Sequence, residues 1–279
     1  MIHHVTPINV LPLFPVLDEK LISLLRSLND EDWRQLTLST NWTVKDVAAH
    51  LLNGNLRTLS LVRDNYFEER RGDIETFQNL VSYLDTLNAE WIVAAKRLSP
   101  RVIIDLLEAT GKEYWEVLKS LDPWEDAAFS AAWAGEEISK NWFHIAREYT
   151  EKWIYQQQIR TVLNMPGILT RELFNPFLET FMCALPQTYK YTDAVVGSSV
   201  MVRVTGEVGG EWHINKTEEG WVLRHTTRVA PLAVVELDAD TTWKLFSKII
   251  SPEEALEKVK ITGAEELGKV ALGIVAVVV

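Results

Sequence analysis

The chain has 279 residues, of which 47% are hydrophobic and 24% charged, and this balance excludes a disordered protein. Its net charge of −11 makes nucleic acid and anionic membrane surfaces poor partners at neutral pH. The single cysteine, Cys183, excludes an intramolecular disulfide and a cluster of thiolate metal ligands.

No apolar run reaches the ~18 residues that a membrane-spanning helix needs, and the closing stretch "ALGIVAVVV" is shorter than that. The opening stretch "MIHHVTPINVLPLFPVLDEK" lacks the basic region of a signal peptide, and its prolines interrupt the apolar residues. We therefore expect a cytoplasmic protein with neither nucleic acid nor membrane as a partner. The length suits two domains, and the sequence leaves a homo-oligomer open.

Apolar residues follow helical spacing from the start of the chain to about residue 165. The first helical segment covers residues 14–35. The second covers residues 43–63 and opens with Thr43 as a plausible N-cap, followed three residues later by Asp46 in a pair that resembles a capping box.

A third helical segment covers residues 77–122 and is broken near Ser99 and Pro100. The fourth covers residues 136–164 and is ended by the sequence "MPG". Four long antiparallel helices predict an up-and-down four-helix bundle that occupies residues 1–167.

The second part of the sequence has a different character. Residues 168–190 read as a helix, and residues 198–227 read as short strands separated by turn residues. A further strand and three helices follow, with start signals at Asp238 or Asp240, at Ser251-Pro252 and after Gly263. We predict a smaller α+β domain with an antiparallel sheet over residues 168–279.

Helical geometry places His50 on the polar side of segment 43–63, beside Asp46, Asn53 and Arg57. The same geometry gathers four side chains on one side of segment 136–164, opposite an apolar stripe: His144, Glu148, Glu151 and Tyr155. Each of these helices therefore carries a narrow polar stripe that includes side chains able to bind a metal ion.

Two interpretations of these stripes stay open. In the first, both stripes face water, as the polar side of an amphipathic helix usually does. In the second, they converge at one end of the bundle, where His50 and carboxylates of the last helix bind a divalent ion. Imidazole together with carboxylate suits zinc, nickel, iron or manganese better than calcium.

Several other residues that could carry chemistry favour structural roles. Cys183 lies in an apolar helical context and is expected to be a buried small hydrophobe. Trp142 and Trp153 stand at helical spacing, which is typical of core positions. His213 and His225 lie on expected strands, where we expect their side chains to face solvent.

Four stretches of the sequence together resemble the mycothiol-dependent maleylpyruvate isomerase family: "NWTVKDVAAHL", "AREYTEKWIYQQQIRTVLNMPG", "LETFMCALPQTY" and "VKITGAEELGKVAL". The resemblance implies a metal-binding, DinB-like four-helix bundle followed by a smaller α+β domain similar to sterol-carrier proteins. The resemblance extends over nearly the whole chain, and the four stretches occur in the same order as in the family.

The resemblance also implies a set of metal ligands. The family binds its ion through one His and a Glu-x-x-x-His pair, which here fall on His50, Glu151 and Tyr155. A neutral phenol is a poor ligand. The site is therefore weakened or lost, or Tyr155 binds as a phenolate, or His144 with Glu148 takes its place. Zinc or nickel is the divalent metal that the resemblance favours.

The function that the resemblance implies is transfer or isomerisation of a small acidic or electrophilic substrate, carried out with a metal ion and a low-molecular-weight thiol. Arg57 and Arg147 are candidates for binding a substrate carboxylate, and each is equally well explained as a surface charge. Tyr155 favours the alternative, a non-catalytic protein that keeps the DinB-like fold and binds a small ligand.

Overall fold

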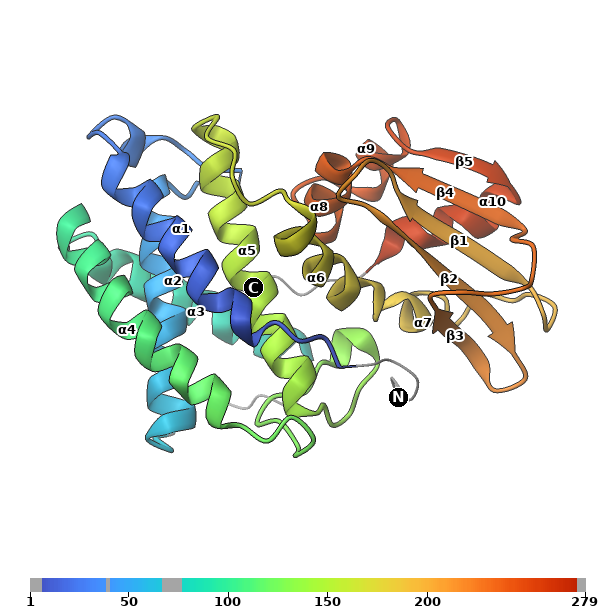
Figure 1. Cartoon of the computed structure of the whole chain (residues 1–279), viewed down its shortest axis with the longest axis horizontal. Helices are drawn as coiled ribbons and strands as arrows, with labels where there is room; N and C mark the ends of the chain where they lie inside the picture. Colours follow the sequence, from blue (N-terminus) through green and yellow to red (C-terminus); the bar gives the residue numbers. More distant parts are fainter. Residues whose placement is uncertain (1–6, 39–40, 67–76, 275–279) are drawn as a thin grey trace. The chain divides into compact units, whose positions relative to one another are not determined.

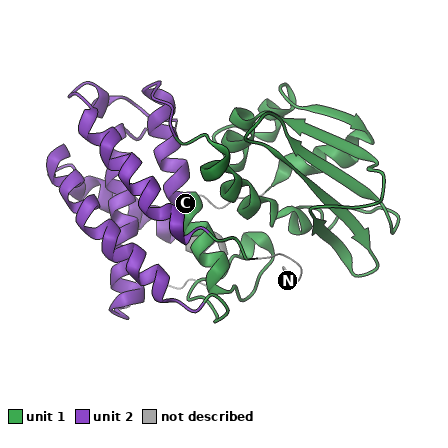
Figure 2. Ribbon diagram, in the orientation of Figure 1, with its two compact units in different colours: residues 1–9, 123–150, 168–278 green, residues 10–122, 151–167, 279 purple. Residues whose placement is uncertain are grey.

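The computed structural model of the chain describes residues 7–38, 41–66 and 77–274 (Figure 1). The chain divides into two compact units (Figure 2). We call residues 10–122 with 151–167 the helical unit, and residues 1–9 with 123–150 and 168–278 the mixed unit. The boundary expected after residue 167 is one point where the chain changes unit, whereas residues 123–150, expected in the first domain, group with the second.

The helical unit is a bundle. Its helices are α1 (Phe14–Ser27), α2 (Val44–Thr58), α3 (Phe77–Ala95), α4 (Pro100–Ser120) and, from residue 151 onward, α5 (Asn141–Val162). A π-helical turn over Leu59–Arg63 extends α2. Helix α2 packs against α3 and α4, and α1 packs against α4. The helical architecture predicted for this part of the chain is confirmed.

Helix starts follow the expected capping signals. The Thr43 hydroxyl accepts a hydrogen bond from the backbone N–H of Asp46, and the Asp46 carboxylate accepts one from the N–H of Thr43, so the capping box is present. Ser99, which the sequence marks only as a break, is also a cap: its hydroxyl accepts a bond from the N–H of Val102 at the start of α4. These bonds fix where α2 and α4 begin.

The first helix is shorter than the sequence predicts. Helix α1 ends at Ser27 rather than continuing to residue 35, because Leu28 adopts an extended backbone. The Asn29 side chain then accepts hydrogen bonds from the backbone N–H groups of Glu31 and Asp32, at 2.8 and 3.0 Å. This local bonding competes with the helix and starts a separate 3-10 turn over Asp32–Arg34.

The mixed unit combines a sheet with short helices. Its helices are α6 (Arg171–Met182), α7 (Leu185–Thr188), α8 (Ala239–Phe246), α9 (Pro252–Leu256) and α10 (Glu265–Lys269). Its strands are β1 (Ser199–Val204), β2 (Gly210–Thr217), β3 (Gly220–Arg224), β4 (Ala233–Leu237) and β5 (Lys260–Gly263). The start signals at Asp238 and Ser251 are confirmed as side-chain N-caps of α8 and α9.

The sheet is mixed, which corrects the antiparallel sheet expected from the sequence. Its strand order is β3-β2-β1-β4-β5, and β1 pairs with β4 in parallel. The connection between β3 and β4 carries the chain past β2 and β1, so that β4 enters on the far side of β1 and runs in the same direction. Strand β5, which the sequence did not indicate, completes the edge beside β4 in an antiparallel pairing.

One face of this sheet forms the core of the mixed unit. Its buried side chains are Val200, Val202, Val204, Trp212, Ile214, Trp221, Leu223, Ala233, Val235 and Leu237. Helix α10 packs closely on them, because a Cβ added at Gly268 would lie 3.3 Å from a methyl carbon of Val235. Over the described residues, no helix combines the length and apolar character required to cross a bilayer.

Candidate functional site

The imidazole of His50 lies within the helical unit, in contact with two other rings. The ring centroids of His50 and Tyr155 are 4.4 Å apart, and those of His50 and Trp42 are 5.0 Å apart. Trp42 and Tyr155 stack on each other at 6.3 Å with an interplanar angle of 27°. We call these three residues the aromatic cluster. Trp42 lies in the segment just before α2, His50 lies on α2, and Tyr155 lies in the second half of α5.

Local hydrogen bonds hold Trp42 in this cluster. The backbone N–H and the hydroxyl of Thr37 both donate to the carbonyl oxygen of Trp42, at 2.8 and 2.9 Å. The capping box at Thr43 then turns the chain directly into α2. The position of the tryptophan is thus fixed by the segment that precedes the helix.

His50 is an uncharged imidazole at neutral pH. Burial and the positive charge of Arg57 lower the pKa of His50 to about 4. The residue as a whole is half-buried, but its Nδ1 atom is fully buried and has no hydrogen-bond partner among the described residues. The ring is therefore a neutral group with one hydrogen-bonding atom unused.

Tyr155 is a buried neutral phenol. Burial raises the pKa of Tyr155 well above its usual value, and the nearby charges of Glu151 and Asp85 raise it further. Ionisation to a phenolate is therefore opposed both by desolvation and by two carboxylates. Tyr155 therefore stays a neutral phenol among the described residues, and only a bound cation could favour the phenolate.

These residues do not fit a divalent-metal site of the expected kind. A catalytic zinc site uses three protein ligands at about 2 Å, and here the third position carries a phenol that packs against the imidazole of His50. Within residues 7–38, 41–66 and 77–274, no three His, Cys, Asp or Glu side chains gather closely enough to hold a metal ion. Of the three expected ligands, His50 and Glu151 therefore remain, and they could supply at most two metal ligands.

The alternative pair lies in the first half of α5, within the mixed unit. His144 Nδ1 and Glu148 Oε1 are 3.9 Å apart, which is beyond hydrogen-bond distance. His144 is buried, both its ring nitrogens lack hydrogen-bond partners among the described residues, and burial lowers its pKa. The pair offers two donors, one fewer than a catalytic zinc site requires.

The two candidate arginines differ in their surroundings. Arg147 is half-buried and donates a hydrogen bond of 3.3 Å to the carbonyl oxygen of Phe129, which ties it to a neighbouring loop. Arg57 is half-buried and forms no ion pair with any described residue, although its charge acts on His50. Arg57 is therefore the better placed of the two to bind an anionic group.

Helix α5 is largely buried, and of its polar stripe His144 and Tyr155 are buried whereas Glu148 and Glu151 are partly exposed. Most of its polar side chains in the helical unit have partners inside the protein. Gln156 donates to the carbonyl oxygen of Leu17 at 3.0 Å, and Lys152 pairs with Asp18 at 2.9 Å. Sequence periodicity missed these positions because it treats polar residues as exposed, and their partners lie more than 130 residues earlier in the chain.

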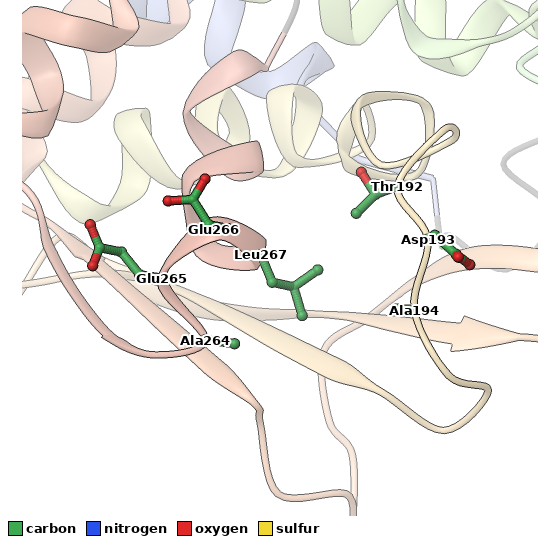
Figure 3. A pocket seen from close by; sticks show the side chains of 7 residues that line it. All are labelled: Thr192, Asp193, Ala194, Ala264, Glu265, Glu266 and Leu267. Carbon is green, nitrogen blue, oxygen red and sulfur yellow. The ribbon is translucent and has the colours of Figure 1, made fainter.

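A separate depression of about 560 Å³ lies in the mixed unit (Figure 3). It is lined by Thr192, Asp193, Ala194, Ala264, Glu265, Glu266 and Leu267. Lys269 pairs with Glu265 at 2.9 Å and with Glu266 at 2.7 Å. Two of its three carboxylates therefore share one lysine, which offsets only one of their two charges.

Comparisons of the sequence and of the structure with known proteins lead to the same family. The family model "Mycothiol maleylpyruvate isomerase N-terminal domain" matches residues 14–160. The crystal structure of the mycothiol-dependent maleylpyruvate isomerase is similar over 94% of this chain and 95% of that chain, with a TM-score of 0.54 and 11% identity. A crystal structure of a histidine-to-alanine mutant of that enzyme matches over the same shares, with a TM-score of 0.53 and 10% identity. No curated protein matches the sequence significantly.

Proposed function

The chain belongs to the mycothiol-dependent maleylpyruvate isomerase family, and from that premise we propose that it binds a small acidic molecule beside His50 and Arg57 without a resident divalent metal. It is a ligand-binding member of the family that keeps the fold and lacks the metal-dependent step. Of the two functions expected from the sequence, this is the non-catalytic binding of a small ligand, which Tyr155 favours; the other is a metal-dependent transferase or isomerase.

One observation carries this proposal. The rings of His50 and Tyr155 are in contact, with centroids 4.4 Å apart, at the two positions where the resemblance expects ligands of one ion. An ion bound by both side chains would have to lie about 2 Å from a donor atom of each. The direct packing of the rings, together with the neutral state of the phenol, supports a site organised for an organic ligand.

The acidic character of the ligand rests on Arg57. Its guanidinium forms no ion pair with a described residue, and its charge contributes to the low pKa of about 4 at His50. Arginine binds carboxylates through two parallel hydrogen bonds. The neutral imidazole beside it supplies a further hydrogen-bonding atom, Nδ1, which is buried and unused.

A thiol-dependent reaction in this chain would need an external thiol. Burial raises the pKa of Cys183, the single cysteine, and the charges of Glu179 and Glu136 raise it further. A buried neutral thiol is a poor nucleophile. Mycothiol, the thiol in the relatives' names, is therefore the cosubstrate to include when activity is measured.

Calorimetric titration of the whole chain with maleylpyruvate, in the presence of a chelator, tests the binding. We expect saturable binding that Arg57→Gln weakens at least about tenfold, which corresponds to loss of about 1.4 kcal/mol. Arg26→Gln is the matched control, because Arg26 is exposed and pairs with Glu108 on the surface at 2.6 Å; it should bind as the wild type does.

Two results would overturn the proposal. The first is equal binding by wild type and Arg57→Gln, or no binding by either. The second is isomerisation of maleylpyruvate by the wild type with mycothiol and added zinc or nickel, at a rate that a chelator abolishes, because that result would restore the metal-dependent enzyme.

A further inference from the structure

Three buried polar atoms that have no hydrogen-bond partner among the described residues lie close together on the sheet of the mixed unit. They are Ser199 Oγ on β1, and Asn215 Oδ1 and His213 Nδ1 on β2. Ser199 is fully buried and Asn215 is 7% exposed, whereas His213 is half-buried. We call these three residues the sheet cluster.

Strand register places the three side chains on the same face. Ser199 lies directly opposite Asn215 in the antiparallel β1–β2 pair, and Met201 lies opposite His213. Residues opposite each other share a face, as do residues two apart on one strand. This face is the reverse of the apolar face that α10 covers, since Val200 and Val202 alternate with Ser199 and Met201.

The amide of Asn215 is held in place by the connection between β3 and β4. Its Nδ2 donates to the hydroxyl oxygen of Thr227 at 3.3 Å, and that oxygen accepts a second bond, of 3.1 Å, from the backbone N–H of Val229. One N–H of the amide is therefore bonded within the protein, which fixes the orientation of the amide and leaves its carbonyl oxygen available.

Buried polar groups in native proteins are almost always hydrogen-bonded, to protein, to water or to a ligand. Three adjacent exceptions on one face therefore indicate a place where hydrogen-bonding groups from outside the chain are accommodated. His213 is the most exposed of the three and marks the side from which such groups enter.

We propose that the sheet cluster binds a small neutral molecule that carries neighbouring hydroxyl groups. Asn215 offers an acceptor, the Ser199 hydroxyl can donate or accept, and the imidazole nitrogen of His213 does either according to its tautomer. A hydroxyl group both donates and accepts, so it satisfies each of these atoms. None of the three side chains supplies a formal charge that would compensate the burial of an ionised ligand.

Nuclear magnetic resonance titration of the whole chain with glucose, used as the polyol probe, tests the inference. We expect saturable shifts of backbone amide signals in β1 and β2. Ser199→Ala should weaken binding at least tenfold. Thr262→Ala is the matched control, because Thr262 is an exposed hydroxyl residue on β5 of the same sheet; it should leave the affinity unchanged.

Thermal unfolding of the same variants separates a ligand site from an ordinary structural hydroxyl. Ser199→Ala should unfold at the wild-type temperature or above it, because the hydroxyl has no partner to lose within the described part of the chain. Asn215→Ser provides a second variant for the titration and should also weaken binding. Absence of saturable shifts, equal affinity in all variants, or a soaked crystal with only ordered water on the three atoms would each overturn the inference. It is independent of the proposed function, since His50 and Arg57 lie in the helical unit.

Discussion

At the scale of single residues, Tyr155 is the residue that separates a ligand-binding site from a metal site in the helical unit. Its phenol is buried beside the imidazole of His50 and is kept neutral by desolvation and by the charges of Glu151 and Asp85. Helix geometry in the sequence places His50 and Tyr155 on polar stripes and leaves open whether these stripes face water or the interior. It does not show that the two rings touch, because ring contact depends on how α2 and α5 pack.

The low pKa of His50 predicts a loss of stability in acid. The pKa is about 4 in the folded protein and about 6.5 in an unfolded chain, so the unfolded state binds the proton more readily. Stability is therefore fully present above pH 6.5 and falls as the pH decreases from 6.5 to 4, by about 3 kcal/mol from this group alone.

Urea unfolding of wild type and His50→Phe at pH 7 and pH 4.5 measures this effect. The phenylalanine keeps a ring in the aromatic cluster and removes the titrating group, so the variant should lose less stability between the two pH values. An equal loss in both proteins would show that His50 does not contribute to acid destabilisation.

At the scale of secondary-structure elements, the sequence predicts where helices begin better than it predicts what they pack against. Capping at Thr43, Asp238 and Ser251 is local and is confirmed. The sequence does not indicate strand β5, because the strand has four residues and its one large apolar side chain, Ile261, is only half-buried. The burial of α5 is not evident from the sequence because polar residues such as Lys152 and Gln156 bond to groups on α1 that are distant in the sequence.

The ion pair between Lys152 of α5 and Asp18 of α1 should stabilise this buried helix. Lys152 Nζ lies 2.9 Å from Asp18 Oδ1 and 4.7 Å from the centre of the Tyr114 ring. Lys152→Met leaves the Asp18 carboxylate without its cation in a largely buried place, and we expect a loss of about 2 kcal/mol in the free energy of unfolding.

Chemical denaturation of Lys152→Met, of Lys152→Met with Asp18→Asn, and of Lys140→Met checks this expectation. The double variant should recover part of the loss, because it removes the unpaired charge. Lys140 pairs with Asp126 at the exposed surface, so its replacement should change stability by less than about 1 kcal/mol. A loss at Lys152 no larger than the loss at Lys140 would contradict a stabilising role for the buried pair.

At the scale of the whole molecule, the resemblance in the sequence predicted the family and the order of a helical part followed by an α+β part. It did not predict how residues 123–150 group. Those residues cluster with the second part of the chain, and their apolar side chains form a common cluster with Cys183: Ala131, Ala134, Trp142 and Phe143. Sequence patterns cannot show such a discontinuous unit, because they place each segment in the same domain as the segments next to it in the sequence.

A chain that ends after residue 167 should therefore lose order in residues 123–150. Hydrogen exchange should be faster there than in the whole chain, since the partners of Trp142 and Phe143 beyond residue 167 are removed. Exchange in α1, α2 and α4 should change less. Unchanged protection of residues 123–150 in the shortened chain would instead support a domain boundary at residue 167.

The most direct test of the central claim is the metal content of three purified proteins after loading with zinc or nickel: wild type, Tyr155→His and Tyr155→Phe. Only Tyr155→His should retain one equivalent of metal through a desalting step, and adding His50→Ala to it should abolish that binding. Tyr155→Phe controls for loss of the hydroxyl, because it keeps the ring that packs on His50. One tightly held equivalent in the wild type, lost on His50→Ala, would contradict the account.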